Sequence, residues 1–192
     1  MMYQKEFADL SEEEYLNFKS DYHQSAAIVR GNILNAVTDL EMSIDLYITN
    51  YFANDAYKGE ELMNLIISPR MTFEQKVQAL MVLIERHDKK ILDENPSMNK
   101  HLLDIIIGER NILAHFPLDA TPQGIRRYYE TSDLTFFKFK NVREGDGNNK
   151  KEIKLNNRVV YDVSKAKKII TLINLYYEII TMAIPIATPL TI

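Results

Sequence analysis

The sequence predicts an all-α protein, a helical bundle with one small antiparallel β-hairpin inserted before its last helix. Apolar residues recur at helical spacing over long stretches of the chain. In one region, 134–140, apolar and polar residues instead alternate and aromatic residues are frequent, which is typical of a half-buried strand. The 192 residues, 46% of them hydrophobic, suit a single domain, 1–192, in which 125–162 forms a β-rich insertion.

A long amphipathic helix is predicted over residues 22–52. Ser11 and Glu14 have the spacing of a helix N-cap and its reciprocal glutamate, so this helix can begin as early as Glu12. The sequence does not decide whether this helix is broken near Gly31, because glycine weakens a helix interior.

Shorter helices follow. One over 60–67 is expected to stop at Ser68-Pro69, because the residue before a proline avoids the α region. Thr72 and Gln75 form a capping box that begins the next helix. Another runs over 98–115 and ends before Pro117.

The pattern changes after residue 125. Beyond the strand at 134–140, we expect a turn at 144–149 and two short strands at 151–155 and 158–161. The last helix is expected over 165–182. Ser164 is the predicted cap of that helix.

Composition and charge limit the function classes. The absence of cysteine excludes disulfides and thiolate metal sites. The N-terminal residues lack an apolar signal core, and the apolar stretch 169–192 is interrupted by Asn174, Glu178 and two prolines. We therefore expect a cytoplasmic protein without a membrane span.

The charge is distributed unevenly along the chain. Residues 1–120 hold 11 Lys and Arg against 20 Asp and Glu, a balance of −9, whereas 121–192 hold 12 against 7, a balance of +5. The basic part can dock a phosphate backbone, or it can be a lysine-rich hairpin that is only solvated.

The most informative motif is Arg110-Asn111-Ile-Leu-Ala-His115, at the end of the predicted helix 98–115. Arg110 is a permanent cation with a planar fork of donors suited to phosphate, and His115 can take or give a proton near neutral pH. Metal-free cleavage of RNA needs both, because a base must activate the ribose 2′-hydroxyl and a cation must neutralise the charge that develops on phosphorus. The same residues can also be an ordinary charged helix end.

The spacing within this motif constrains the site. Five residues place Arg110 and His115 about 140° apart on an ideal helix, so they do not share one narrow face. Convergence needs a distorted helix end or a second copy of the chain. A homodimer with this helix at its two-fold axis would bring two arginines and two histidines into one cleft.

The segment Glu109 to His115 resembles the signature of the HEPN superfamily, in which an arginine and a polar residue are followed by a histidine. The helix that begins at Phe73 is similar to the one before the motif in many members. The resemblance covers roughly residues 20–120 and the last helix. It implies an all-helical, usually dimeric ribonuclease of toxin–antitoxin, phage-defence or CRISPR-associated type.

The resemblance also implies roles for the residues. His115 would be the general base, Arg110 the cation that stabilises the phosphate, and Asn111 a hydrogen-bonding group that orients the cleft. The product would be a 2′,3′-cyclic phosphate, with no metal and no cofactor. The implied partners are RNA, a second copy of the chain and, for a toxin, an antitoxin protein.

Cations and aromatic residues interleave in the predicted insertion. Candidate RNA-binding residues are Arg126, Arg127, Lys138 and Lys140. The remaining histidines, His23, His87 and His101, have no metal-ligand spacing, and no metal site is predicted.

Two other hypotheses stay open. The chain can be a non-catalytic HEPN-like adaptor that binds a nucleotide or a partner protein. It can also be an unrelated bundle in which Arg110 and His115 only cap a helix end.

Overall fold

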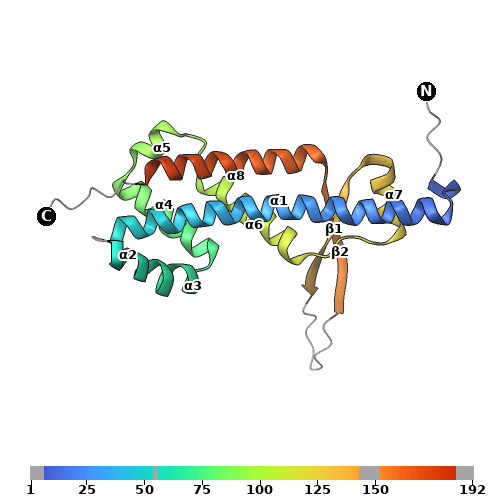
Figure 1. The fold of residues 1–192 in the computed structure, drawn as a ribbon, viewed down its shortest axis with the longest axis horizontal. Helices are drawn as coiled ribbons and strands as arrows, with labels where there is room; N and C mark the ends of the chain where they lie inside the picture. The colour runs from blue at the N-terminus through green and yellow to red at the C-terminus, as the bar shows by residue number, and fades with distance from the viewer. Residues whose placement is uncertain (1–6, 54–55, 143–151, 185–192) are drawn as a thin grey trace. The chain divides into compact units, whose positions relative to one another are not determined.

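The computed structural model describes residues 7–53, 56–142 and 152–184, and for 56, 138–142, 152–157 and 163 it describes the backbone alone. These residues form an all-α fold with a two-stranded antiparallel hairpin before the last helix, which confirms the predicted fold class (Figure 1). The chain falls into two compact units. The first comprises Met1–Ile33 and Asn111–Lys168, and the second comprises Leu34–Arg110 and Ile169–Ile192.

A short 3₁₀ turn, η1 (Phe7–Asp9), precedes the long helix α1 (Glu12–Phe52). The predicted capping box is present: Ser11 N donates to Glu14 Oε2 at 2.7 Å, and Glu14 N donates to Ser11 Oγ at 3.3 Å. The helix is unbroken at Gly31. A glycine costs a helix only about 1 kcal/mol relative to alanine, which the burial of neighbours such as Ile33 and Val37 offsets.

In the second unit, α1 is followed by α2 (Ala56–Leu62), the π-helical η2 (Met63–Ile67) and α3 (Ser68–Arg70). The predicted stop at Ser68-Pro69 is therefore wrong. Ser68 N donates to the carbonyl of Met63, a π-helical bond that shifts the ladder by one residue. Pro69 then falls in the first turn of α3, where the fixed φ of proline suits a helix.

Helix α4 (Phe73–His87) begins at the predicted capping box of Thr72 and Gln75. It packs a lysine against α1: Lys76 Nζ lies 2.7 Å from Glu41 Oε1 and 2.9 Å from Asp45 Oδ2, and it is 2% exposed. Burial lowers the pKa of Lys76, but the hydrogen bonds with Glu41 and Asp45 outweigh it, so the pKa is raised. A short α5 (Lys90–Glu94) follows.

The first unit contains a helix that sequence reasoning missed, α7 (Pro122–Thr131). Thr121 caps it by accepting from Gly124 N at 3.3 Å, and Pro122 occupies its first turn. Ser132, at φ 60°, ends it in the left-handed conformation. The start of the predicted β-rich insertion, 125–131, is therefore helical.

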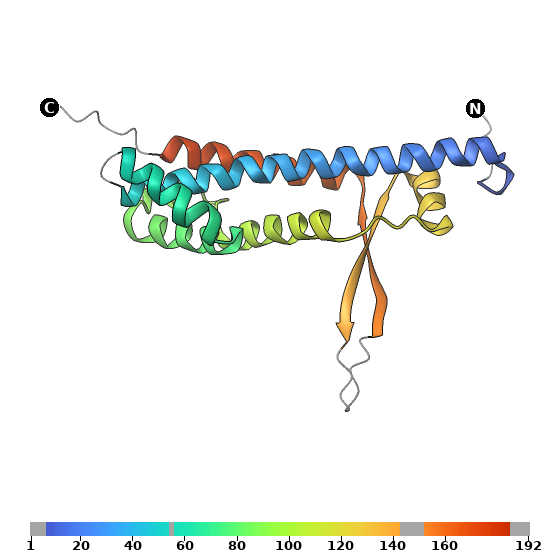
Figure 2. The same cartoon turned by 60° about the horizontal axis from the view of Figure 1, so that its bottom comes forward.

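The hairpin consists of β1 (Leu134–Val142) and β2 (Glu152–Tyr161), paired from Leu134↔Tyr161 to Val142↔Glu152 (Figure 2). One strand thus replaces the two predicted at 151–155 and 158–161. The pairing shifts by one residue between Lys138 and Phe139, where β2 has one residue more than β1. The predicted turn 144–149 lies outside the described residues.

The last helix, α8 (Val163–Ala183), is capped by Asp162, whose Oδ1 accepts from Lys165 N. The prediction that Ser164 is the cap is wrong, because the helix begins one residue before it. In the second unit, Tyr176 of α8 is fully buried, and its hydroxyl donates to the carbonyl of Ser97 at 2.8 Å and accepts from Asn99 N at 2.9 Å.

Candidate active site

Helix α6 (Lys100–His115) carries the predicted motif at its C-terminal end. It begins after Asn99, whose Oδ1 accepts from Leu102 N at 3.0 Å, and it ends before Pro117 as predicted. Arg110 is half-buried, whereas Asn111 and His115 are exposed. His115 therefore lies in the last helical turn, open to solvent.

The helix runs without a break through Arg110 and His115. Helical periodicity keeps these two residues about 140° apart around the axis, as the sequence predicts. Arg110 ends one segment of the second unit, and Asn111 and His115 belong to the first. All three motif residues lie on α6.

A second arginine lies next to the end of α6, and sequence reasoning missed it. Arg30 of α1 donates from its guanidinium to the carbonyl of Phe116, the residue after His115. The same group lies 4.8 Å from the centre of the Phe136 ring. Burial lowers the pKa of Arg30. Arg30 is a cation within the apolar stripe of α1. No local sequence pattern predicts which carbonyl its guanidinium will contact.

The chain after His115 is fastened to β1. The carbonyl of Pro117 accepts from Phe137 N at 3.0 Å, and Asp119 N donates to the carbonyl of Thr135 at 2.8 Å. Leu118 forms an isolated antiparallel bridge with Phe136. These bonds fix the path of the backbone that leaves the candidate catalytic histidine.

Buried polar groups also hold the same loop. The hydroxyl of Tyr22 donates to the carbonyl of Asp119 at 3.1 Å, and Thr135 N donates to that hydroxyl at 3.4 Å. Desolvation, more than the nearby charges, raises the pKa of Tyr22 to about 12.

The carboxylate of Asp119 is fully buried. Its Oδ1 accepts from Thr121 N at 3.2 Å and from the Thr121 hydroxyl. Its Oδ2 lies 3.1 Å from Arg158 Nε, an ion pair that is not aligned as a hydrogen bond. Asp119 therefore links the loop after α6 to the start of α7 and to β2.

The four predicted RNA-binding residues fall on two elements. Arg126 and Arg127 lie on α7, 63% and 48% exposed, and are paired with Glu130 at 2.7 Å and Asp133 at 3.5 Å. Lys138 and Lys140 lie on β1, and their side chains are outside the described residues. An exposed ion pair such as Arg126–Glu130 contributes little to stability.

Within the described ranges, no group of three or more His, Asp or Glu side chains is arranged to hold a metal ion. No helix in that part of the chain is long and apolar enough to cross a membrane. Comparison with protein-family models, curated proteins and solved structures found no match.

Proposed function

We propose that this protein is a metal-independent endoribonuclease of HEPN type, active as a homodimer and serving toxin–antitoxin or antiphage defence. The observation that carries the proposal is the end of α6, where Arg110, Asn111 and His115 follow one another with His115 exposed in the last turn. The charge asymmetry of the sequence supports it, since residues 121–192 carry the excess of basic groups.

In the proposed reaction, His115 takes the proton of a ribose 2′-hydroxyl, and the 2′-oxygen attacks the adjacent phosphorus. The bond from phosphorus to the 5′-oxygen breaks, leaving a 2′,3′-cyclic phosphate. The 5′-oxygen takes a proton from solvent to become a 5′-hydroxyl, and protonated His115 returns its proton to solvent. Arg110 stabilises the charge on the phosphoryl oxygens through its guanidinium donors. Asn111 supplies hydrogen bonds that orient the phosphate.

The geometry of α6 supports the proposed homodimer. Because helical periodicity sets Arg110 and His115 about 140° apart, the arginine of one protomer is expected to meet the histidine of the other across a two-fold axis. Arg126 and Arg127 of α7 are proposed to bind the backbone of the RNA, together with Lys138 and Lys140 of β1.

The test is cleavage of a mixed RNA pool in EDTA by wild type, His115→Ala and His101→Ala. His101 is the matched control, because it is an exposed histidine on the same helix, near its start. We expect wild type and His101→Ala to cleave, and His115→Ala to lose at least ~10²-fold in rate, the smaller end of what a general base contributes. The cleaved ends should be 2′,3′-cyclic phosphates.

Circular dichroism of the three proteins should be the same, because both histidines are exposed. Undiminished cleavage by His115→Ala would remove the assignment of His115 as the base. A folded dimer that leaves every RNA intact would instead favour the adaptor hypothesis.

A further inference from the structure

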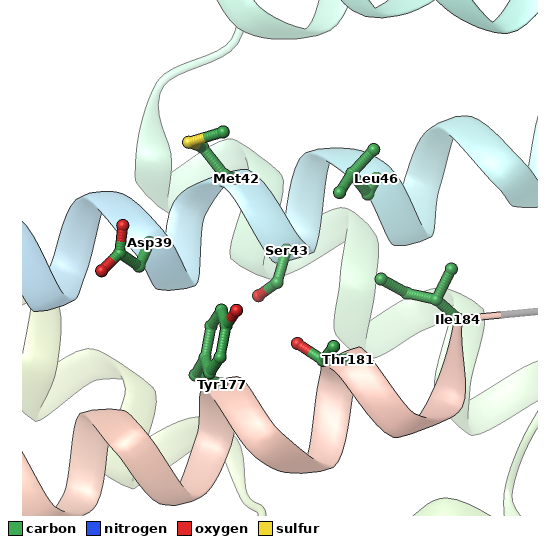
Figure 3. Close-up of a pocket in the computed structure, with 7 residues that line it drawn as sticks. All are labelled: Asp39, Met42, Ser43, Leu46, Tyr177, Thr181 and Ile184. Carbon is green, nitrogen blue, oxygen red and sulfur yellow. The ribbon is translucent and has the colours of Figure 1, made fainter.

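A groove of about 150 Å³ lies in the second unit, between α1 and α8 (Figure 3). Met42 and Leu46 lie on its α1 side and Tyr177 on its α8 side. Its buried hydroxyl, Ser43 Oγ, donates to the carbonyl of Leu40 at 2.8 Å. No lysine, arginine or histidine is among the described residues that line it, so the groove offers neither a base nor a cation to the proposed cleavage of RNA.

The last turn of α6, which contains His115, belongs to the first unit and has limited support from its own helix. Phe116 N donates to the carbonyl of Ile112 at 2.9 Å. Pro117 has no N–H, so the carbonyl of Leu113 receives no bond from it. The position of this turn therefore depends on groups from elsewhere in the fold.

Two such groups hold the backbone that follows His115. The guanidinium of Arg30, on α1, donates to the carbonyl of Phe116. Phe137 N, on β1, donates to the carbonyl of Pro117 at 3.0 Å. The first two carbonyls after the histidine are thus bonded, one to a side chain and one to a strand. A cation is also favoured at the C-terminal end of a helix, where the last carbonyls point.

The guanidinium of Arg30 is itself held in place. Its Cζ lies 4.8 Å from the ring centre of Phe136, a fully buried residue of β1. A flat guanidinium can stack on a ring and donate from its edge at the same time, which an ammonium cannot do. Arg30 therefore connects α1, β1 and the end of α6 through one half-buried side chain.

We infer that Arg30 is a positioning residue for His115. By holding the carbonyl of Phe116, it keeps the last turn of α6 closed, and with it the imidazole that takes the proton of the ribose 2′-hydroxyl. Arg30 touches neither the RNA nor the reacting atoms in this role, which differs from the role of Arg110. The inference rests on the proposed ribonuclease, in which His115 is the base.

The first measurement is the NMR order parameter of the His115 amide in wild type and in variants of Arg30. Arg30→Met removes the donors and keeps an apolar stem, whereas Arg30→Lys keeps a charge and a donor. We expect about 0.85 in wild type and Arg30→Lys, the value of a rigid backbone, and a fall toward ~0.6 in Arg30→Met. Arg30→Gln is a second removal variant, because its side chain is shorter, and it should reproduce Arg30→Met.

Two references show whether the loosening is local. The amide of Leu103, near the start of α6, should keep its wild-type order parameter in every variant. Lys19→Met is the matched control, because Lys19 is an exposed cation on α1 in the same unit. It should leave the order parameter of His115 unchanged.

The second measurement is the rate of RNA cleavage as a function of RNA concentration. Arg30→Met should lower kcat about tenfold, since a catalytic group misplaced by ~1 Å can cost ~10²-fold. Its KM should stay within about twofold of the wild-type value, because Arg30 does not bind the RNA. Arg30→Lys should keep kcat within about threefold of wild type, since it keeps a cation at the helix end. Lys19→Met should cleave as wild type does.

Several results would overturn the inference. They are a His115 amide that stays rigid in Arg30→Met and Arg30→Gln, an equal fall at Leu103 and His115, and a raised KM with unchanged kcat. If wild type cleaves RNA and Arg30→Met cleaves it at the same rate, the inference fails and the ribonuclease stands. If wild type cleaves no RNA but the His115 amide loosens in Arg30→Met alone among the two unit-matched variants, the ribonuclease fails and the anchoring of His115 by Arg30 stands.

Discussion

In the second unit the ammonium of Lys76 is buried between two carboxylates. In the first unit the carboxylate of Asp119 is buried, with the backbone N–H and hydroxyl of Thr121 donating to Oδ1 and the guanidinium of Arg158 3.1 Å from Oδ2. The lysine cluster joins two long helices, α1 and α4, through groups of opposite charge. The Asp119 cluster joins a loop to α7 and β2. Polar burial therefore fixes helix packing in one unit and fixes the loop beside the candidate catalytic histidine in the other.

The two units also differ in the groups that lie next to their buried clusters. In the lysine cluster, Asp45 Oδ2 accepts from Lys76 Nζ at 2.9 Å and from Ser68 Oγ at 3.0 Å. The loop of the first unit has, next to it, an exposed histidine, a half-buried Arg30 and a hairpin in a basic part of the chain. The candidate histidine thus lies in the first unit and Arg110 ends a segment of the second, whose buried lysine cluster is expected to contribute stability.

The largest expected effect is that of Lys76→Ala. Removing the ammonium leaves the buried carboxylate of Asp45 without its counter-charge, which should lower the free energy of unfolding by about 3–5 kcal/mol. Urea unfolding followed by circular dichroism measures it. The matched control is Lys90→Ala, which removes an exposed lysine 3.4 Å from Glu94 and should change stability by at most about 0.5 kcal/mol. Equal effects of the two variants would contradict the role of the buried cluster.

An intermediate effect is expected for Gly124→Ala in the first unit. A Cβ at Gly124 would lie 2.0 Å from the carbonyl oxygen of Asp119, so the loop or α7 must move. The expected loss in stability is about 1–3 kcal/mol, visible in the midpoint of urea unfolding.

Gly31→Ala serves as the control for that change, because a Cβ there meets nothing within 4 Å. Alanine in the interior of α1 should raise stability by about 0.5–1 kcal/mol. A neutral Gly124→Ala would mean that the Asp119 loop is not held as tightly as the comparison requires.

The smallest effect concerns pH. The pKa of Tyr22 is raised from 10.0 to about 12, so the native state holds this proton more firmly than the unfolded state. Its contribution is complete below pH 10 and is lost as pH rises toward 12. At pH 11, wild type should have lost about 1.4 kcal/mol of stability through this residue.

The measurement is urea unfolding of wild type and Tyr22→Phe at pH 8 and pH 11. The stability gap between the two proteins should shrink at the higher pH, since phenylalanine does not titrate. A gap that stays constant would show that the Tyr22 hydroxyl is not desolvated as described.

Local patterns predicted much of the helical architecture. The capping boxes at Ser11 and Thr72 and the end of α6 before Pro117 depend on residues a few positions apart, and all three are present. Thr121-Pro122 carried a comparable signal for α7, a cap followed by a proline in the first turn, which was missed because the following residues are polar and aromatic.

The surroundings of the candidate site could not be predicted in the same way. Tyr22 contacts the carbonyls of Asp119 and Thr135, which are 97 and 113 residues away in sequence. Arg30 meets a carbonyl 86 residues away. No spacing rule connects such groups, because the tertiary fold and not the local helix brings them together. The motif itself, by contrast, lies within one helix and could be identified by its residues.

Cleavage of two matched pools in EDTA, one of RNA and one of the same sequences with 2′-O-methyl riboses, tests the central claim most directly. The proposed mechanism requires a free 2′-hydroxyl as nucleophile and His115 as its base. Wild type should therefore cut the RNA pool to 2′,3′-cyclic phosphates and leave the methylated pool intact, and His115→Ala should leave both intact. Cleavage of the methylated pool, an RNA pool left whole by wild type, or cleavage that survives in His115→Ala would contradict the account.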